Sequence, residues 1–133
     1  NTTIDIAQDE NGVVLQLRDN ILFESGKADL IDGSSEILDK INTLISTLPN
    51  SIVIEGHTDN VPISTSVYKD NWDLSTARAS NVLRYFTQLK GQDPTRFSAA
   101  GYGEYKPKVD NSTDENRAQN RRVNILIVSN NEE

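Results

Sequence analysis

The chain has 133 residues, of which 35% are hydrophobic and 25% charged. This length suits one domain that buries about two thirds of its unfolded surface, so we expect a single domain over residues 1–133. The formal net charge of −7 argues against a nucleic-acid partner, because binding a phosphate backbone requires a basic face. Cysteine is absent, which excludes disulfides, thiolate zinc sites and cysteine nucleophiles.

The first expected element is a hairpin within residues 1–20, which also serve as the lead-in to the domain. Asn11-Gly12 stands between two segments in which apolar and polar residues alternate, and this is the strongest local signal for a hairpin. The apolar run at 21–23 either continues the second strand or follows a bulge near Asp19-Asn20. Residues 25–29 should then form a loop.

A helix, a strand and a second helix are expected in the middle of the chain. Apolar residues recur every three or four positions between 32 and 48, which predicts an amphipathic helix that Pro49 ends. The mostly apolar segment 51–56 predicts a strand. A second amphipathic pattern predicts a helix over 73–90, and its expected caps are Asp73 or Ser75 at the start and Gly91 past the end.

Shorter elements are expected toward the C-terminus. Asp93-Pro94 predicts a single helical turn, and residues 97–102 predict a strand weakened by small residues. Ser112 and Glu115 match the capping box S-x-x-E and should open a short helix that continues to about residue 120. The last strand, 123–128, is apolar at nearly every position and is therefore expected to be covered on both faces. Residues 130–133 are a tail.

The order of these elements predicts the fold class. A hairpin is followed by helix, strand, helix, strand, short helix and strand, and such alternation places helices against a sheet. We therefore expect an α+β fold, with a βαβαβ core whose mixed sheet packs against helices and an N-terminal hairpin before it.

The long connection between the strand at 51–56 and the next helix carries the candidate chemistry. Asp59 follows the end of that strand, and Arg78 lies near the start of the helix, so a tight connection would bring both to one rim of the sheet. Asp59 could then accept from an ammonium while Arg78 pairs with a carboxylate, which would clamp a zwitterion. The alternative is that the two residues pair with each other or cap the helix.

His57 and Asp59 form the pattern H-x-D, which allows a metal site or an acid–base pair in principle. The chain has no second histidine and no cysteine, and it lacks the motifs H-E-x-x-H and G-x-S-x-G. We therefore expect no catalytic residue, no metal and no cofactor, and a structural histidine that hydrogen-bonds to loop backbone.

Three other features have more ordinary interpretations. Gly101-Tyr102-Gly103 lacks the rest of a phosphate-binding motif and is expected to be a turn. Arg121-Arg122 could be a small basic patch, but surface ion pairs with the nearby acids at 110, 114 and 115 are the neutral expectation. Trp72 and Tyr68 could be exposed binding aromatics, although packing of the tryptophan against the sheet edge is the commoner arrangement.

Several separated blocks resemble one known family. They are GHTDNVP, NWDLSTARA, RFSAAGYGEYKP and NRAQNRRVNILI, together with LFESGKADL at 22–30, and they occur in order between about residues 12 and 128. This set resembles the OmpA-like peptidoglycan-binding domain, and the longer loop with DNVPI looks most like the branch found in MotB-type stator proteins of the flagellar motor. Agreement of several blocks is far more specific than one short motif.

The resemblance implies a ligand and a set of site residues. Proteins of this family hold the diaminopimelate residue of peptidoglycan stem peptides, which carries an amino and a carboxylate group at its free end. In this family the ligand is bound by residues of the TD, L-S-x-x-R and N-R-R motifs, by an asparagine before L-S, and by loop backbone that corresponds to the region near residue 26. The implied site residues are Gly26, Thr58, Asp59, Asn71, Arg78 and Arg121.

The resemblance also implies a cellular setting. It implies a non-catalytic anchor in the periplasm or another extracytoplasmic space, a homodimer, and a membrane ion-channel subunit as partner of the full-length protein. The chain begins without methionine and contains no apolar run of about 20 residues, so any membrane anchor is expected to lie outside it. The alternative within the family is a wall anchor of an OmpA- or Pal-type envelope protein. An enzyme acting on wall peptides and a pure dimerisation scaffold are the alternatives from other classes.

Overall fold

The computed structural model describes residues 4–129, so the predicted tail and the first three residues of the lead-in lie outside the described residues. The main elements are β1 (Asp5–Asp9), β2 (Gly12–Arg18), α1 (Ser34–Ser46), β3 (Ile52–His57), α2 (Asn71–Arg84), β4 (Phe97–Gly101), α3 (Asp114–Asn120) and β5 (Arg122–Val128). Shorter helical segments occur at Asp19–Ile21, Tyr85–Leu89 and Pro94–Arg96. In this part of the chain, every helix is too short or too polar to cross a membrane.

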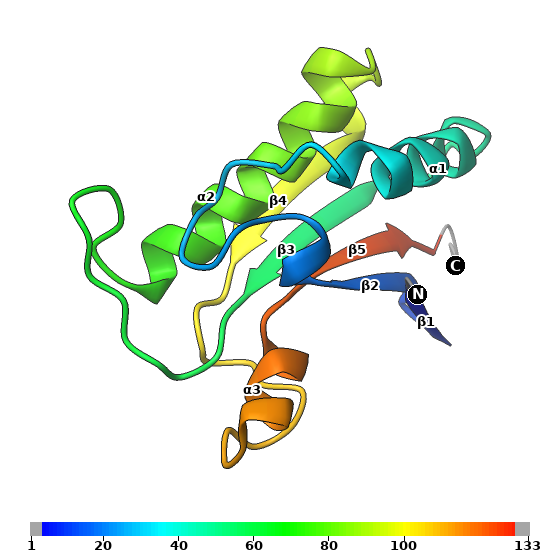
Figure 1. Cartoon of the computed structure of the whole chain (residues 1–133). Helices are drawn as coiled ribbons and strands as arrows, with labels where there is room; N and C mark the ends of the chain where they lie inside the picture. The colour runs from blue at the N-terminus through cyan, green and yellow to red at the C-terminus, as the bar shows by residue number, and fades with distance from the viewer. Residues whose placement is uncertain (1–3, 130–133) are drawn as a thin grey trace.

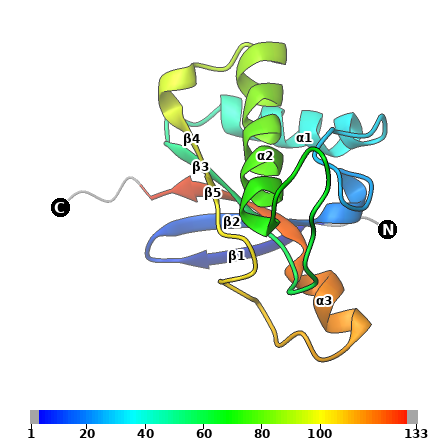
Figure 2. The same cartoon turned by 90° about the vertical axis from the view of Figure 1, so that its left-hand side faces the viewer.

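The strands form one mixed sheet in the order β1-β2-β5-β3-β4. β1 and β2 make the predicted hairpin, which closes where Asp9 faces Gly12, and β5 runs antiparallel to both β2 and β3. β3 and β4 are parallel. Helices α1 and α2 lie on the same face of the sheet (Figure 1, Figure 2). The predicted α+β class, with a mixed sheet packed against helices, is therefore confirmed.

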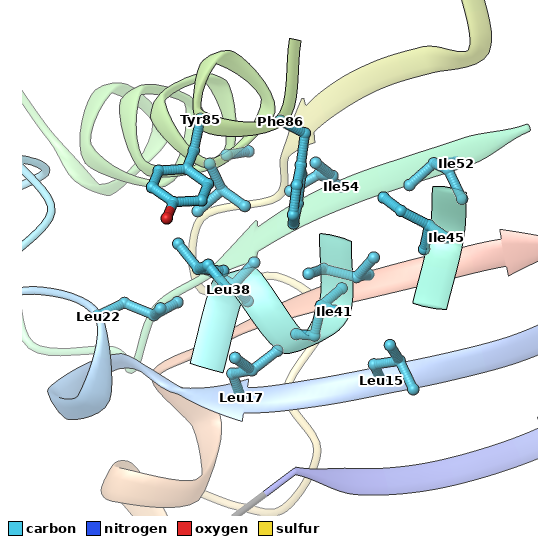
Figure 3. Close-up of a cluster of buried hydrophobic side chains, with 14 of the residues drawn as sticks. Leu15, Leu17, Leu22, Leu38, Ile41, Ile45, Ile52, Ile54, Tyr85 and Phe86 are labelled. Carbon is cyan, nitrogen blue, oxygen red and sulfur yellow. The ribbon is translucent and has the colours of Figure 1, made fainter. Parts of the chain in front are cut away.

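The core lies between this face of the sheet and the two helices (Figure 3). The predicted amphipathic pattern explains why α1 joins it: Leu38, Ile41 and Ile45 are spaced three and four residues apart and are all buried. They face inward side chains of the strands and of the helical segment Tyr85–Leu89 that follows α2, which include Leu15, Leu17, Ile52, Ile54 and Phe86. Burial of these apolar side chains is the main stabilising term of the fold.

The second long helix begins earlier than the pattern predicts. Its N-cap is Asp70, whose side chain accepts from the backbone N–H of Asp73 at 2.9 Å, so the predicted caps Asp73 and Ser75 are wrong. Asp73 instead accepts from the backbone N–H of Lys69 at 2.8 Å, which satisfies a second free donor. The chain leaves the helical segment at Gly91, whose φ of +74° suits the predicted glycine stop.

Two other local predictions need correction. The cap of α3 is Thr113, which accepts from the backbone N–H of Asn116, because Ser112 is engaged by the side chain of Asp110. The apolar run at 21–23 neither continues β2 nor follows a bulge. The chain turns out of the sheet through the short segment Asp19–Ile21, and Phe23 pairs only in an isolated bridge with Leu30.

The last strand is covered on one face and half-buried on the other. Val123, Ile125 and Ile127 are buried under the helices, whereas Asn124 and Leu126 point to the opposite face and are half-buried. The prediction that both faces are covered was therefore wrong, because the two long helices lie together on one side (Figure 2). Successive strand residues consequently enter different environments, and this matters for the arginines at the start of β5.

Candidate functional site

Two glycines allow α2 to lie directly on the ends of β3 and β4. A Cβ atom added to Gly56 would lie 2.1 Å from the carbonyl oxygen of Ser75, and one added to Gly101 would lie 2.2 Å from Oγ1 of Thr76. Only glycine permits this close approach. The first turns of α2 are thereby held beside the end of β3, where the loop that carries Asp59 begins.

A pocket of about 380 Å³ opens at this end of the molecule. Its walls come from the segment after β2, the loop after β3, the start of α2 and the residue before β5. The residues that line it are Asp19, Asn20, Phe23, Ser25, Gly26, Thr58, Asp59, Val61, Pro62, Ile63, Asn71, Leu74, Arg78 and Arg121. All six residues that the sequence predicts as site residues are among them.

Asp59 is held by Arg121, which comes from the junction between α3 and β5. The Asp59 carboxylate lies 2.8 Å from Nη1 of Arg121 and also accepts from the backbone N–H of Val61 at 3.0 Å. Burial acts to lower the pKa of Arg121, but the hydrogen bond to Asp59 and the nearby charge of Asp19 outweigh it, so the net shift is upward. The Arg121 side chain stays 38% exposed and can therefore meet a ligand while it holds Asp59.

Arg78 is far more enclosed, with only 3% of its surface exposed. Its Nη1 donates to the Asp19 carboxylate at 2.9 Å, and its Nε and Nη2 donate to the carbonyl oxygens of Lys27 and Glu24 at 2.8 and 3.2 Å. The guanidinium also lies over the ring of Phe23, 4.6 Å from its centre. Burial lowers its pKa and the charge of Asp19 partly offsets this shift. The protein therefore uses three of the five N–H groups of Arg78.

Asp19 is the member of the site that the sequence reasoning missed. It is buried, pairs with Arg78, and lies 3.7 Å from Nε of Arg121, so one carboxylate serves both arginines. Asp59 and Arg78 do not pair with each other, because Asp59 pairs with Arg121 and Arg78 pairs with Asp19. Neither caps the helix, whose N-cap is Asp70. The sequence does show that the alternating pattern breaks at Asp19-Asn20, so it places an acid at the end of a strand. It does not show toward which face the Asp19 side chain points.

The remaining predicted residues shape the loops around the charges. The hydroxyl of Thr58 donates to the carbonyl oxygen of Asp59 at 2.8 Å, and the amide of Asn71 donates to that of Val61 at 3.1 Å. Gly26 has a φ of +71°, a conformation that favours glycine, and it turns the loop that forms the opposite wall. These contacts give the long loop after β3 a defined course.

His57 lies outside this pocket, on the other face of the sheet. Its Nε2 is 3.3 Å from the Glu55 carboxylate and its ring stacks on Tyr102 at 5.2 Å, so the expected bond to loop backbone is replaced by a side-chain contact. Burial lowers the pKa of His57, with the hydrogen bond to Glu55 acting in the opposite direction. Within residues 4–129, no group of three or more histidine or acidic side chains is arranged to hold a metal ion.

Arg122 and Trp72 also differ from expectation. The neighbouring arginines do not form the expected surface ion pairs: Arg121 joins the pocket, and Arg122 is buried and donates to the carbonyl oxygens of Asn120 and Lys106, both at 2.9 Å. Trp72 does not pack into the sheet edge. It stacks on Tyr105, which lies in the segment after β4, and remains 49% exposed.

Comparisons with known proteins identify the family of the chain. The OmpA family profile matches residues 22–121. Motility protein B of Bacillus subtilis is 42% identical over 118 residues, which cover 88% of this chain and 45% of that protein. The chain thus spans about half the length of the curated relatives that it matches.

Two solved structures have the same fold. A MotB-like protein of Desulfovibrio vulgaris is 38% identical, with a TM-score of 0.88 over 93% of this chain and 80% of that one. The cell wall anchor of the type VI secretion system (T6SS) of Pseudomonas aeruginosa is 32% identical, with a TM-score of 0.89 over 95% and 87% of the two chains. The family profile covers most of the sequence, and these structures share its fold almost throughout. The chain therefore belongs to the OmpA family.

Proposed function

We propose that this chain is a non-catalytic anchor that binds bacterial peptidoglycan by holding the diaminopimelate residue of a stem peptide in the pocket. One observation carries the proposal: four charged side chains from distant parts of the sequence, Asp19, Asp59, Arg78 and Arg121, converge on one open pocket. The two acids and the two arginines balance each other in formal charge. A ligand that brings one ammonium and one carboxylate keeps that balance.

The proposed contacts follow from which atoms are still accessible. The ligand ammonium meets the Asp59 carboxylate. The ligand carboxylate meets the partly exposed guanidinium of Arg121. Arg78, which lines the pocket but is almost fully enclosed, adds its positive charge beside that carboxylate. Charge-assisted hydrogen bonds of this kind are about twice as strong as neutral ones. The apolar part of the wall, Phe23, Pro62 and Ile63, suits the methylene chain between the two ends.

The local character of these contacts fits the charge of the whole chain. With a net charge of −7, the protein gains no long-range attraction to an anionic wall polymer. Recognition then depends on hydrogen bonds inside the pocket, which are less screened by salt than surface contacts. We accordingly propose that binding persists at moderate ionic strength.

The relationship to motility protein B supports a role as the wall anchor of a flagellar stator subunit. In that role the domain is periplasmic, forms a homodimer, and belongs to a longer protein with an inner-membrane segment and an ion-channel partner. The similarity to the T6SS wall anchor favours a second candidate, an anchor of another envelope protein. A full-length gene with one N-terminal membrane span would favour the stator, and a barrel or lipobox would favour the second candidate.

The test is co-sedimentation of the protein with purified peptidoglycan sacculi. Asp59→Asn keeps the shape of the side chain and removes the charge that receives the ammonium, so we expect binding to be abolished. Asp32→Asn is the matched control, because Asp32 is exposed and lies outside the pocket. Unchanged sedimentation of Asp59→Asn would overturn the proposed site. Release of new fragments from muropeptides would instead support an enzyme.

A further inference from the structure

Trp72 and Tyr105 form an exposed pair of aromatic rings that the proposed pocket does not use. Their ring centres are 5.0 Å apart with an angle of 23° between the planes, so they stack. Trp72 is nonetheless 49% exposed and Tyr105 is 62% exposed. We call this pair the aromatic shelf. A cluster of solvent-exposed aromatic side chains commonly marks a binding surface.

The backbone between the two rings favours their contact. Gly103 has a φ of +59°, so glycine provides the turn, and both rings pack within van der Waals distance of this position. Gly103 also accepts a hydrogen bond from the backbone N–H of Thr58 at 2.9 Å and donates to the Ser75 hydroxyl at 3.0 Å. The shelf is therefore built into the fold.

The shelf is attached to residues that line the pocket. Trp72 directly follows Asn71, whose side chain lines the pocket, and Thr58 both lines the pocket and holds the loop that carries Tyr105. Figure 2 shows the start of α2, the loop before it and the segment after β4 gathered at one place. A ligand that fills the pocket and continues outward can thus reach the shelf.

We infer that the aromatic shelf is a subsite for a sugar ring of the glycan strand that carries the bound stem peptide. This inference rests on the proposed function. A pyranose ring presents a flat face of C–H groups that packs on an aromatic ring, and the two rings of the shelf are themselves uncharged. A stem of three residues spans roughly 10 Å, so the sugar that carries it lies outside the pocket when the end of the stem is bound inside.

The subsite assigns separate tasks to the two parts of the surface. The pocket recognises the charged end of the peptide, and the shelf adds affinity for the sugar to which that peptide is attached. An intact wall fragment should therefore bind more tightly than the free peptide. An aromatic contact of this kind contributes up to about tenfold in affinity.

The experiment titrates the protein with two probes: the tripeptide L-alanyl-D-glutamyl-diaminopimelate, and the same tripeptide on its N-acetylglucosamine–N-acetylmuramic acid disaccharide. We expect the second probe to bind up to about tenfold more tightly. Trp72 is the only tryptophan in the chain, so its fluorescence reports directly on the shelf. The disaccharide probe should change the emission much more than the tripeptide.

Trp72→Ala should bind both probes equally, at the affinity of the free tripeptide. Tyr105→Ala removes the other ring from a loop, without altering the start of α2, and should reduce the difference between the probes in the same way. Leu89→Ala is the control, because Leu89 is 67% exposed at the far end of the same helical segment, and it should keep the full difference.

The two proposals can fail separately. Equal affinities of the two probes for the unaltered protein, or a difference that persists in both ring variants, would overturn the sugar subsite and leave the peptide pocket intact. Failure of the tripeptide itself to bind would overturn the proposed function and the subsite together.

Discussion

Arg121 and Arg122 are neighbours in the sequence, but they lie on opposite sides of the sheet in different surroundings. Arg121 faces the pocket, where the carboxylates of Asp59 and Asp19 balance its charge. Arg122 is buried on the other side and is held by two backbone carbonyl oxygens. Burial lowers the pKa of Arg122 to about 10, and the charge of Glu55 only partly offsets this.

The difference separates a binding charge from a structural one. Arg121 remains partly exposed and has carboxylate partners, so a zwitterionic ligand can replace part of its contacts without leaving a charge alone. Arg122 has no such access. It joins the end of α3 to the segment after β4, through the carbonyl oxygens of Asn120 and Lys106. The same residue type thus has a proposed binding role at Arg121 and attaches a loop at Arg122.

The largest expected effect comes from the enclosed ion pair inside the pocket. Arg78→Ala would leave Asp19 as a buried carboxylate that has lost its closest partner, and it would free the carbonyl oxygens of Lys27 and Glu24. We expect the free energy of unfolding to fall by about 3–5 kcal/mol. Urea denaturation followed by circular dichroism measures this change.

Asp19→Asn in the Arg78→Ala background provides the internal check. Because the second change removes the stranded charge, the double variant should be more stable than Arg78→Ala alone. A loss below about 1 kcal/mol in the single variant would mean that the pair contributes no more than a surface salt bridge.

A smaller effect is expected from the same substitution at the two neighbouring arginines. Arg122→Met keeps an unbranched side chain in a buried position but loses two charge-assisted hydrogen bonds. The loss is partly offset, because the substitution also removes the desolvation cost of a buried charge. We expect it to lower the free energy of unfolding by about 1–2 kcal/mol and to leave peptidoglycan binding unchanged. Arg121→Met should instead abolish binding to sacculi. Equal binding by the two variants would contradict the division between the two sides of the sheet.

The smallest effect concerns pH on the side of the sheet opposite the pocket. Burial, opposed by the hydrogen bond to Glu55, sets the pKa of His57 below its ordinary value of 6.5. The unfolded chain then binds more protons than the folded one as the pH falls below that value, so acidification lowers stability. The hydrogen bond from His57 also lowers the pKa of Glu55 below 4.5, which adds a loss at still lower pH.

His57→Gln should flatten the first part of this decline. We expect its free energy of unfolding to depend less on pH than that of the unaltered protein between about pH 7 and pH 5. Urea midpoints at several pH values provide the measurement. An identical slope in both proteins would show that His57 is not the group responsible.

Much of the fold could be predicted because the relevant signals are local. The turn at Asn11-Gly12, the apolar period of α1 and the strand β3 all depend on residues close together in the sequence, and the structure has each of them. Cap positions were less accurate: Asp70 and Thr113 had competing neighbours of the same chemistry, and only the actual course of the backbone selects among them.

The sequence by itself determined the fold class and, through the order of its motif blocks, six residues that line one pocket. Only the tertiary structure decided how the charges pair. Arg78 meets Asp19 across 59 positions of the sequence, and Arg121 meets Asp59 across 62. The periodicity of a sequence shows which face of a helix or strand is apolar. Charge pairing depends instead on how distant segments pack together. The role of Asp19 in the pocket and the different surroundings of Arg121 and Arg122 could therefore be seen only in the tertiary structure.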